Sequence, residues 1–214
     1  MNYTQLVANI QNFLEDDSAE LSASIDQIIA QAEEMIYQRL PNLPCFRHSL
    51  SLNFVAGQQD YTIPDARMIR QVARLQGPLL PGGSGYFYLD HRIDSYLRDY
   101  WPDPSATGTP PKYYSTKTAT TGGTTITVAP TPSGNFTVEV DYIAPETGLS
   151  SGNANTWIGD NAENVLLAAC LYEASAFLKA GETLSLYKTQ FDEAVQLFVQ
   201  EMQRDYAAEY NGGL

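Results

Sequence analysis

The chain is organised around a stretch that begins Trp157-Ile158-Gly159-Asp160-Asn161-Ala162-Glu163. The residues that follow, up to Leu178, are apolar around most of a helix and include several alanines, which let another backbone come close. Such a helix needs to be buried on several sides. We expect Asp160 to cap this helix and Glu163 to reach back and complete a capping box.

A second helix is predicted to follow the first almost directly. Lys179 suits the negative C-terminal end of the first helix, and Gly181 suits the position that stops it. From about Thr183 onward, apolar residues recur at steps of three and four in one stripe, namely Leu184, Tyr187, Phe191, Val195, Phe198, Met202 and Tyr206. Two long helices joined by a few residues form an antiparallel hairpin, which we take as the scaffold of the fold.

The N-terminal segment is also predicted to be helical. Residues 3–14 and residues 19–40 each carry apolar residues on one face. Both faces need a partner, and the C-terminal hairpin is the obvious one. We therefore expect a four-helix cluster built from residues 1–45 and residues 157–214.

The middle of the chain, residues 46–156, switches to the period of two that is typical of strands. We expect a hairpin over residues 49–64, a strand over 68–75, a loop over 77–85 and a short helix capped by Asp90. The later β-branched runs, punctuated by Gly and Pro, predict a meander. The sequence thus predicts an α+β chain with an inserted antiparallel β-domain of about six or seven strands.

The charge of the chain is strongly negative and unevenly spread. The formal net charge is −13; residues 1–45 hold seven acidic residues against one basic residue, and residues 151–214 hold nine against three. An acidic chain binds phosphates poorly, since DNA affinity comes largely from Lys and Arg. It could still line a channel through which DNA slides, because repulsion prevents sticking. Simple solubility is the other explanation of this charge.

We predict no catalytic, cofactor or metal site. The acidic pair at residues 16–17 lies between two surface helices and is better explained as a solvated linker. His48 and His91 have no zinc-ligand spacing with Cys45 or Cys170, so we expect two reduced, packed thiols. The sequence contains no Gly-X-Ser-X-Gly motif and no apolar run of about 20 residues. We therefore expect neither an enzyme nor a membrane protein.

Aromatic residues concentrate in the middle section, and two explanations stay open. One is a platform for stacking sugars, as in a carbohydrate-binding module. The other is core packing together with a protein interface, where Tyr and Trp are enriched. We favour the second explanation, and the candidate interface aromatics are Tyr86, Tyr88, Tyr100 and Trp101.

Several short segments follow one another in a distinctive order. Two helices lead into the hairpin of residues 57–64, and the run from Ile93 to Pro102 comes next. Then come Thr107-Gly108-Thr109-Pro110-Pro111-Lys112-Tyr113-Tyr114, Ala129-Pro130-Thr131-Pro132-Ser133-Gly134, and Trp157-Ile158 before the small-residue helix. Over nearly the whole chain, this order and spacing resemble the head-to-tail adaptor proteins of short-tailed bacteriophages, of the tail-tubular-A or head-completion type.

The resemblance implies a structural virion protein without a cofactor. Members of this family form a ring, commonly of twelve copies, that joins the portal at the capsid vertex to the tail nozzle and fibres. The helical part surrounds the DNA channel, through which DNA passes without specific binding, and we expect assembly in the host cytoplasm. The C-terminal segment often reaches the portal in this family, so the candidate portal contacts are Tyr206, Glu209, Tyr210 and Leu214. The alternative function is a carbohydrate-binding or tail-fibre-associated β-module with a helical anchor.

Overall fold

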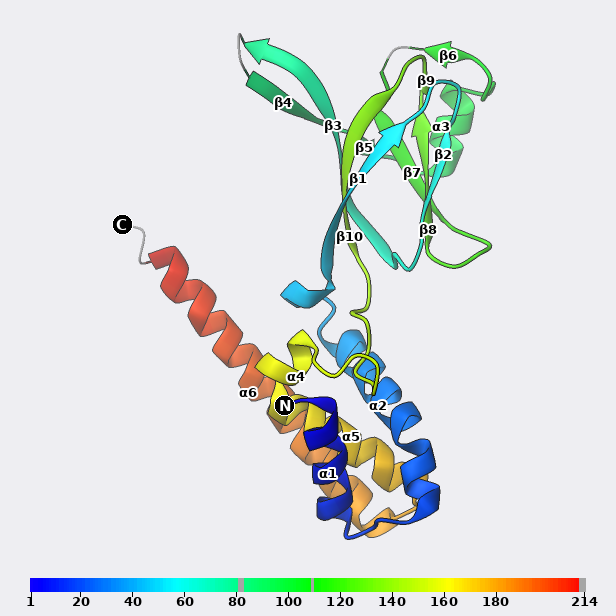
Figure 1. The fold of residues 1–214 in the computed structure, drawn as a ribbon. Helices are drawn as coiled ribbons and strands as arrows, with labels where there is room; N and C mark the ends of the chain where they lie inside the picture. The colour runs from blue at the N-terminus through cyan, green and yellow to red at the C-terminus, as the bar shows by residue number, and fades with distance from the viewer. Residues whose placement is uncertain (81–82, 109, 212–214) are drawn as a thin grey trace. The chain divides into compact units, whose positions relative to one another are not determined.

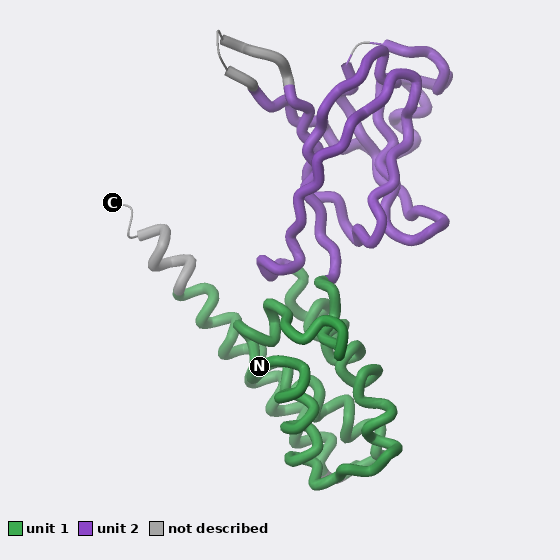
Figure 2. Tube along the Cα trace, viewed as in Figure 1, with its two compact units in different colours: residues 1–41, 146–214 green, residues 42–145 purple. Residues whose placement is uncertain are grey.

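A computed structural model of the 214-residue chain describes residues 1–80, 83–108 and 110–211. Within these ranges, the side chains of residues 76–80, 83–84, 182 and 205–211 lie outside the description. The chain divides into two compact units (Figure 2), which we call the helical unit (residues 1–41 and 146–214) and the β-rich unit (residues 42–145). The predicted α+β class is confirmed.

The helical unit is built around one central helix (Figure 1). Its helices are α1 (Tyr3–Leu14), α2 (Ala19–Arg39), α4 (Trp157–Asn161), α5 (Glu163–Phe177) and α6 (Gly181–Asn211). Helix α5 contacts α1, α2, α4 and α6. The described part of the unit therefore contains the short helix α4 in addition to the four predicted helices.

The sequence of α5 explains why it is central. Its buried residues lie on most of its circumference, and they are Val165, Leu166, Ala168, Ala169, Cys170, Leu171, Ala174 and Ser175. Large apolar side chains from the surrounding helices pack around them, among them Leu6 and Ile10 from α1, Ile29 and Ile36 from α2, and Phe191 from α6. Full burial of one such side chain is worth about 1.5–3 kcal/mol. The two ends of the chain are thus held together by apolar contacts around one helix.

The ends of α5 differ from the prediction. A separate helix, α4, comes first and is capped by Thr156, whose hydroxyl accepts the Gly159 N–H at 3.1 Å. The backbone leaves the helical conformation at Ala162, and α5 then begins. Asp160 therefore lies inside α4 and is not a cap. At the other end of α5, we expected Gly181 to stop the helix. Lys179, with φ of 54°, takes the left-handed conformation instead, and Gly181 begins α6.

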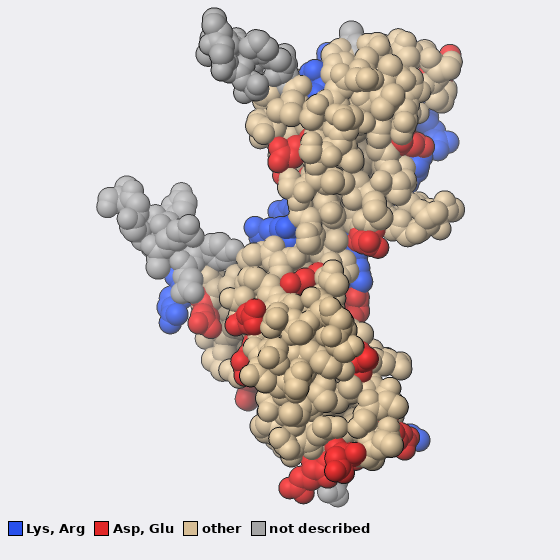
Figure 3. All heavy atoms as spheres, in the orientation of Figure 1, with Lys and Arg blue, Asp and Glu red and all other residues tan. Residues whose placement is uncertain are grey.

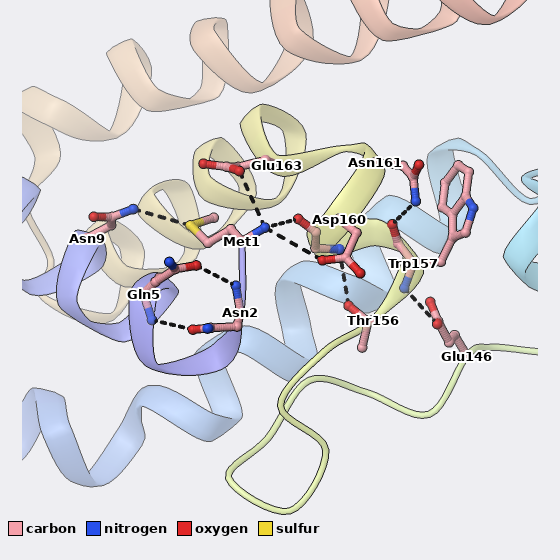
Figure 4. Close-up of polar contacts among 11 residues, drawn as sticks. Met1, Asn2, Gln5, Asn9, Glu146, Thr156, Trp157, Asp160, Asn161 and Glu163 are labelled. Atoms are coloured by element: carbon pink, nitrogen blue, oxygen red, sulfur yellow. Dashed lines mark hydrogen bonds and ion pairs between the residues drawn. The ribbon is translucent and has the colours of Figure 1, made fainter.

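The N-terminal ammonium group of Met1 joins α1 to α4 and α5 (Figure 4). It donates a hydrogen bond to the Gly159 carbonyl oxygen and lies 3.9 Å from the Asp160 carboxylate and 3.4 Å from that of Glu163. Both carboxylates are more than half exposed, so each ion pair is worth at most about 1 kcal/mol. Asp160 and Glu163, predicted to cap a helix, instead balance this charge.

Residues 146–156 belong to the helical unit, whereas the sequence boundary assigned them to the β-rich part. Glu33 on α2 accepts the backbone N–H of Leu149 at 3.0 Å, and Glu146 accepts that of Trp157 at 2.8 Å. The Leu149 side chain is buried as well. These contacts are made by single residues in an irregular segment, so no periodicity in the sequence indicated them.

The β-rich unit contains two four-stranded sheets. Sheet A has the order β1 (Arg47–Phe54), β10 (Phe136–Ile143), β3 (Met68–Leu80), β4 (Gly83–Tyr88). Sheet B has the order β2 (Asp60–Ile63), β8 (Thr124–Ala129), β7 (Tyr113–Thr118), β5 (Asp90–His91). The remaining elements are the 3-10 helix η1 (Pro44–Phe46), helix α3 (Asp94–Tyr100) and the pair β6 (Thr107–Gly108) and β9 (Thr131–Pro132).

One apolar core lies between the two sheets. Sheet A contributes Phe54, Val72, Val138 and Val140, and sheet B contributes Tyr61, Ile63, Tyr114, Ile126 and Val128. The alternation of buried and exposed residues that predicted strands therefore gives each sheet one inward face. Strands β5, β6 and β9 have two residues each, and the pairs β5–β7 and β6–β9 are parallel, so the unit is not antiparallel throughout.

Three predictions in this region were wrong. The hairpin over residues 49–64 does not exist, because β1 pairs with β10 in sheet A while β2 pairs with β8 in sheet B. The loop over 77–85 is mostly strand, since β3 continues to Leu80 and β4 begins at Gly83. Asp90 lies in β5 and does not cap a helix; α3 begins at Asp94.

The close approach of Met1 to Gly159 predicts the effect of Gly159→Ala. An added Cβ would lie 2.6 Å from the Met1 carbonyl oxygen, so α1 or α4 would have to shift. Overpacking of this kind costs about 1–3 kcal/mol, more than the roughly 1 kcal/mol that Ala gains over Gly in a helix. We expect a lower melting temperature by circular dichroism. Gly152→Ala is the matched control, because nothing lies within 4 Å of its Cβ; equal melting temperatures for the two variants would contradict the prediction.

A second prediction concerns Glu33 and pH. Burial raises the pKa of the Glu33 carboxyl, the hydrogen bond from Leu149 opposes this rise, and the nearby charge of Glu146 adds to it. Because the pKa is higher in the folded than in the unfolded chain, the folded chain binds the proton more tightly between the two values. Wild-type stability should therefore rise relative to Glu33→Gln as the pH falls from neutrality to about 4.3, the ordinary pKa of a glutamate.

Thermal melts of both proteins across this range measure the difference. The glutamine keeps an acceptor for the Leu149 N–H but does not titrate. Glu193→Gln, at an exposed position of α6, controls for the loss of one negative charge from the helical unit. Parallel stability curves for the wild type and Glu33→Gln would show that this carboxyl does not carry the pH dependence.

Candidate interaction surfaces

Helix α3 carries a cluster of aromatic rings beside β7. The ring of Tyr96 lies 4.6 Å from that of Tyr100 and 5.9 Å from that of Tyr113, measured between centroids, and Trp101 lies 5.4 Å from Tyr113. The Arg92 guanidinium lies 5.7 Å from the Tyr96 ring centroid. Tyr100 is 66% exposed, whereas Trp101 is half-buried. The cluster therefore packs α3 onto the sheet and leaves the Tyr100 side chain exposed.

A cleft of about 470 Å³ lies beside this cluster. Its charged side chains form two ion pairs: Lys117 lies 2.8 Å from Asp60, and Arg98 lies 2.6 Å from Asp94. Burial alone would raise the pKa of Asp60, but the hydrogen bonds from Lys117 and Thr127 outweigh it and the pKa is lowered. A carboxylate that stays ionised and paired suits a polar contact and does not suit general acid catalysis.

Strand β4 presents a second aromatic surface. Tyr86 and Tyr88 are 52% and 56% exposed, and both side chains lie on the outer face of sheet A. Phe87, between them, points to the other face, where it packs against the core with Arg74 5.2 Å from its ring. Hydrogen bonding with Glu139 raises the pKa of Tyr86. The alternation of the strand thus exposes both tyrosines while it anchors the residue between them.

The predicted interface aromatics therefore form two surfaces and not one. Figure 1 shows β4 and α3 on opposite sides of the β-rich unit. Tyr86 and Tyr88 belong to one surface, and Tyr100 and Trp101 belong to the other. The predicted portal contacts lie outside the described side chains: Tyr206, Glu209 and Tyr210 fall within the bounds of α6, and Leu214 is not described.

The structure also contains a groove that sequence reasoning missed. It has a volume of about 380 Å³, lies between the start of α5 and helix α6, and includes Leu197, which is 66% exposed. Phe198 lines it too, as do four acidic residues, Asp160, Glu163, Glu193 and Glu201. The spacing of Glu193, Leu197 and Glu201 by four residues was a signal on the sequence, because such residues share one face of a helix.

Among the described residues, no three His, Cys, Asp or Glu side chains lie together as a metal site would require. Cys45 and Cys170 form no disulfide, and burial raises the pKa of the Cys170 thiol, which makes it unreactive. Within the described part of the chain, no helix is both long enough and apolar enough to span a membrane.

The net charge of the protein lies entirely on the helical unit. This unit holds 17 acidic residues and 4 basic residues, whereas the β-rich unit holds 8 of each. Figure 3 shows acidic side chains gathered at the end of the helical unit where α1 meets α2. One unit is therefore poorly suited to contact phosphates, and the other is electrically balanced.

Comparison with known proteins connects these features to a family. A family model described as SU10 adaptor protein matches residues 1–212 of the chain. The chain belongs to the SU10 adaptor protein family. This agrees with the resemblance to phage head-to-tail adaptors. No curated protein matches the chain.

Family membership identifies the protein as a bacteriophage structural adaptor. Such a protein is a virion component and associates with other virion proteins, such as those of the portal and tail. An adaptor binds its partners through its surfaces. The exposed aromatics of the β-rich unit and the acidic groove of the helical unit are therefore its candidate functional features.

Proposed function

We propose that this SU10-family adaptor is a subunit of a ring that joins the portal at the capsid vertex to the tail nozzle and fibres, and that its helical unit lines the DNA passage. The supporting observation is the distribution of charge. The whole net charge of −13 falls on the helical unit, and the β-rich unit is neutral. A negative wall repels phosphates, so DNA can slide through the ring without binding to it.

The assembly follows from the same proposal. A closed ring needs two different side surfaces on each subunit, because contacts between unlike surfaces generate rings. The family resemblance favours twelve copies. The exposed aromatics of the neutral β-rich unit, Tyr86, Tyr88, Tyr100 and Trp101, supply contacts between proteins of the assembly, because aromatic residues are enriched in protein interfaces. We propose no catalytic activity, since the charged side chains of the cleft are paired with each other.

The cleft beside Trp101 favours the carbohydrate-binding alternative. It combines an aromatic ring with hydrogen-bonding groups of Asp60, Lys117 and Thr127. Sugar sites use the same combination of a stacking surface and polar side chains. This alternative requires that the isolated protein bind glycans and that Trp101→Ala abolish the binding. The proposed adaptor role requires neither result.

The first prediction from the proposed function concerns assembly on the portal. The purified protein, mixed with portal rings of its own phage, should form one discrete complex whose mass corresponds to a complete adaptor ring. Native mass spectrometry or mass photometry measures this mass. A portal from an unrelated phage serves as the control. A monomer that ignores its own portal and binds glycans in a screen would instead support the carbohydrate-binding alternative.

The second prediction concerns the C-terminal segment. Deletion of residues 207–214 should leave the rest of the chain folded, because the last residue that the structure describes as buried in the helical unit is Phe198. Portal binding should weaken, because the deletion removes three of the four candidate portal contacts, Glu209, Tyr210 and Leu214. Circular dichroism checks the fold and a pull-down with portal rings checks the binding. A chain that lacks only residues 212–214 separates the role of Leu214 from the rest, and normal binding by the longer deletion would refute the prediction.

A further inference from the structure

Sheet A ends on two long strands with open outer edges. These are β1, with eight residues, and β4, with six, and no described strand pairs with the outer edge of either. The edges of sheet B are different, because β2 has four residues and β5 has two. Proteins usually guard open edges with short strands, charged residues or proline. Strand β4 contains no charged residue and no proline, and β1 contains none from Ser49 to Phe54.

The hydrogen-bond pattern fixes which backbone groups face the open edge of β4. The Leu89 N–H donates to the Val72 carbonyl oxygen at 2.9 Å. In an antiparallel pair, hydrogen-bonded and non-hydrogen-bonded residue pairs alternate. Phe87 and Arg74, two residues further along, therefore form the next hydrogen-bonded pair. The N–H and C=O groups of Tyr86 and Tyr88 consequently point away from β3, toward the open edge.

The same argument applies to β1 at the opposite edge. The Ala144 N–H donates to the Phe46 carbonyl oxygen at 3.0 Å, in the register that continues through the β1–β10 pair. The N–H and C=O groups of Ser49, Ser51 and Asn53 therefore point toward the open edge of β1. Both edges thus present regularly spaced donors and acceptors that a further strand could use.

The side chains at the two edges are complementary. On the outer face, the bulky and exposed Tyr86 and Tyr88 of β4 would meet the short Ser49 and Ser51 of β1, which leave room for the rings. On the inner face, each edge carries apolar side chains that the core covers only in part, Phe87 on β4 and Leu50 and Leu52 on β1. Joining the edges would remove more of this apolar surface from water.

We propose that β4 of one copy pairs with β1 of the next copy, so that sheet A continues from subunit to subunit. Three successive antiparallel pairings make β4 run opposite to β1 within one copy. A neighbour related by rotation therefore presents its β1 antiparallel to β4. The outer face of sheet A in one copy then continues as the outer face of sheet A in the next. The contact joins two unlike surfaces, as a ring requires. The inference rests on the proposed ring and names the surface through which its copies meet.

Cross-linking between two cysteine variants tests the pairing directly. Both variants are made in a Cys45→Ser background, and one of them is isotope-labelled. Tyr86→Cys is mixed in turn with Ser49→Cys, Ser51→Cys and Asn53→Cys and oxidised mildly, with and without portal rings. Mass spectrometry should find a disulfide between labelled and unlabelled chains for at least one of these combinations, and none for Tyr86→Cys alone.

Proline variants test the backbone contact. Tyr86→Pro and Ser51→Pro each remove an N–H that faces an open edge. Neither substitution breaks a hydrogen bond between strands of the same chain. Each should raise the dissociation constant between copies of the chain by about tenfold or more, because roughly one hydrogen bond between the copies is lost. Thr62→Pro is the matched control: the Val128 N–H bond to the Gln59 carbonyl oxygen makes the Thr62 N–H face the open edge of β2. That variant should self-associate normally.

Three results would overturn the pairing. One is the absence of any β4–β1 cross-link both with and without the portal. Another is a disulfide between two copies of the Tyr86→Cys chain, which would indicate β4–β4 pairing. The third is self-association that both edge prolines leave unchanged while the variants remain folded by circular dichroism. Portal binding by a chain without the cross-link would leave the adaptor function standing and reject only this surface.

Discussion

The helical unit depends on the burial of α5 on several sides. Three alanines, Ala168, Ala169 and Ala174, keep the helix narrow enough for its neighbours to approach, and larger apolar residues from both ends of the chain pack around it. The arrangement carries a cost, because the Ser175 hydroxyl is buried and has no hydrogen-bond partner among the described residues. Leaving such a group unsatisfied costs about 1–3 kcal/mol, so the apolar contacts must outweigh this cost. They also hold together segments that are more than 100 residues apart in sequence.

The same contacts allow the unit to carry an unusual charge. Seventeen acidic residues against four basic residues repel one another, and this repulsion works against a compact state. Several of these carboxylates also have structural roles: Glu33 and Glu146 accept backbone N–H groups, and Asp160 and Glu163 face the Met1 ammonium group. The acidic character therefore serves the fold in part, and under the proposed function the remaining carboxylates are the ones that would repel DNA.

The sequence predicted the helices well because their apolar period is local. Residues 3–14 and 19–40 agree with α1 and α2 to within a residue, and the apolar pattern after Trp157 indicated a helix buried on several sides. Alternation shows which face of a strand is buried but not which strand lies beside it. The sequence therefore predicted a hairpin over residues 49–64, whereas β1 and β2 lie in different sheets. Gly and Pro residues at 77–85 indicated a loop where β3 and β4 continue. Thr156 caps α4 in place of Asp160, since both residue types suit an N-cap and only the backbone conformation separates them.

Recognition surfaces were the hardest feature to predict, and the reason is physical. An aromatic run such as Tyr86-Phe87-Tyr88 looks uniform in the sequence, yet alternation directs Phe87 to the core and leaves the two tyrosines exposed. The same alternation applies to the backbone, since groups that do not bond to β3 must face the open edge. A monomer that leaves two such edges open can polymerise into an open-ended filament. A closed ring forms only if the rotation angle between neighbouring copies is a whole-number fraction of a full turn. If the ring assembles on the portal, as the proposed function predicts, the symmetry of the portal would impose that rotation, and the edges need only be complementary.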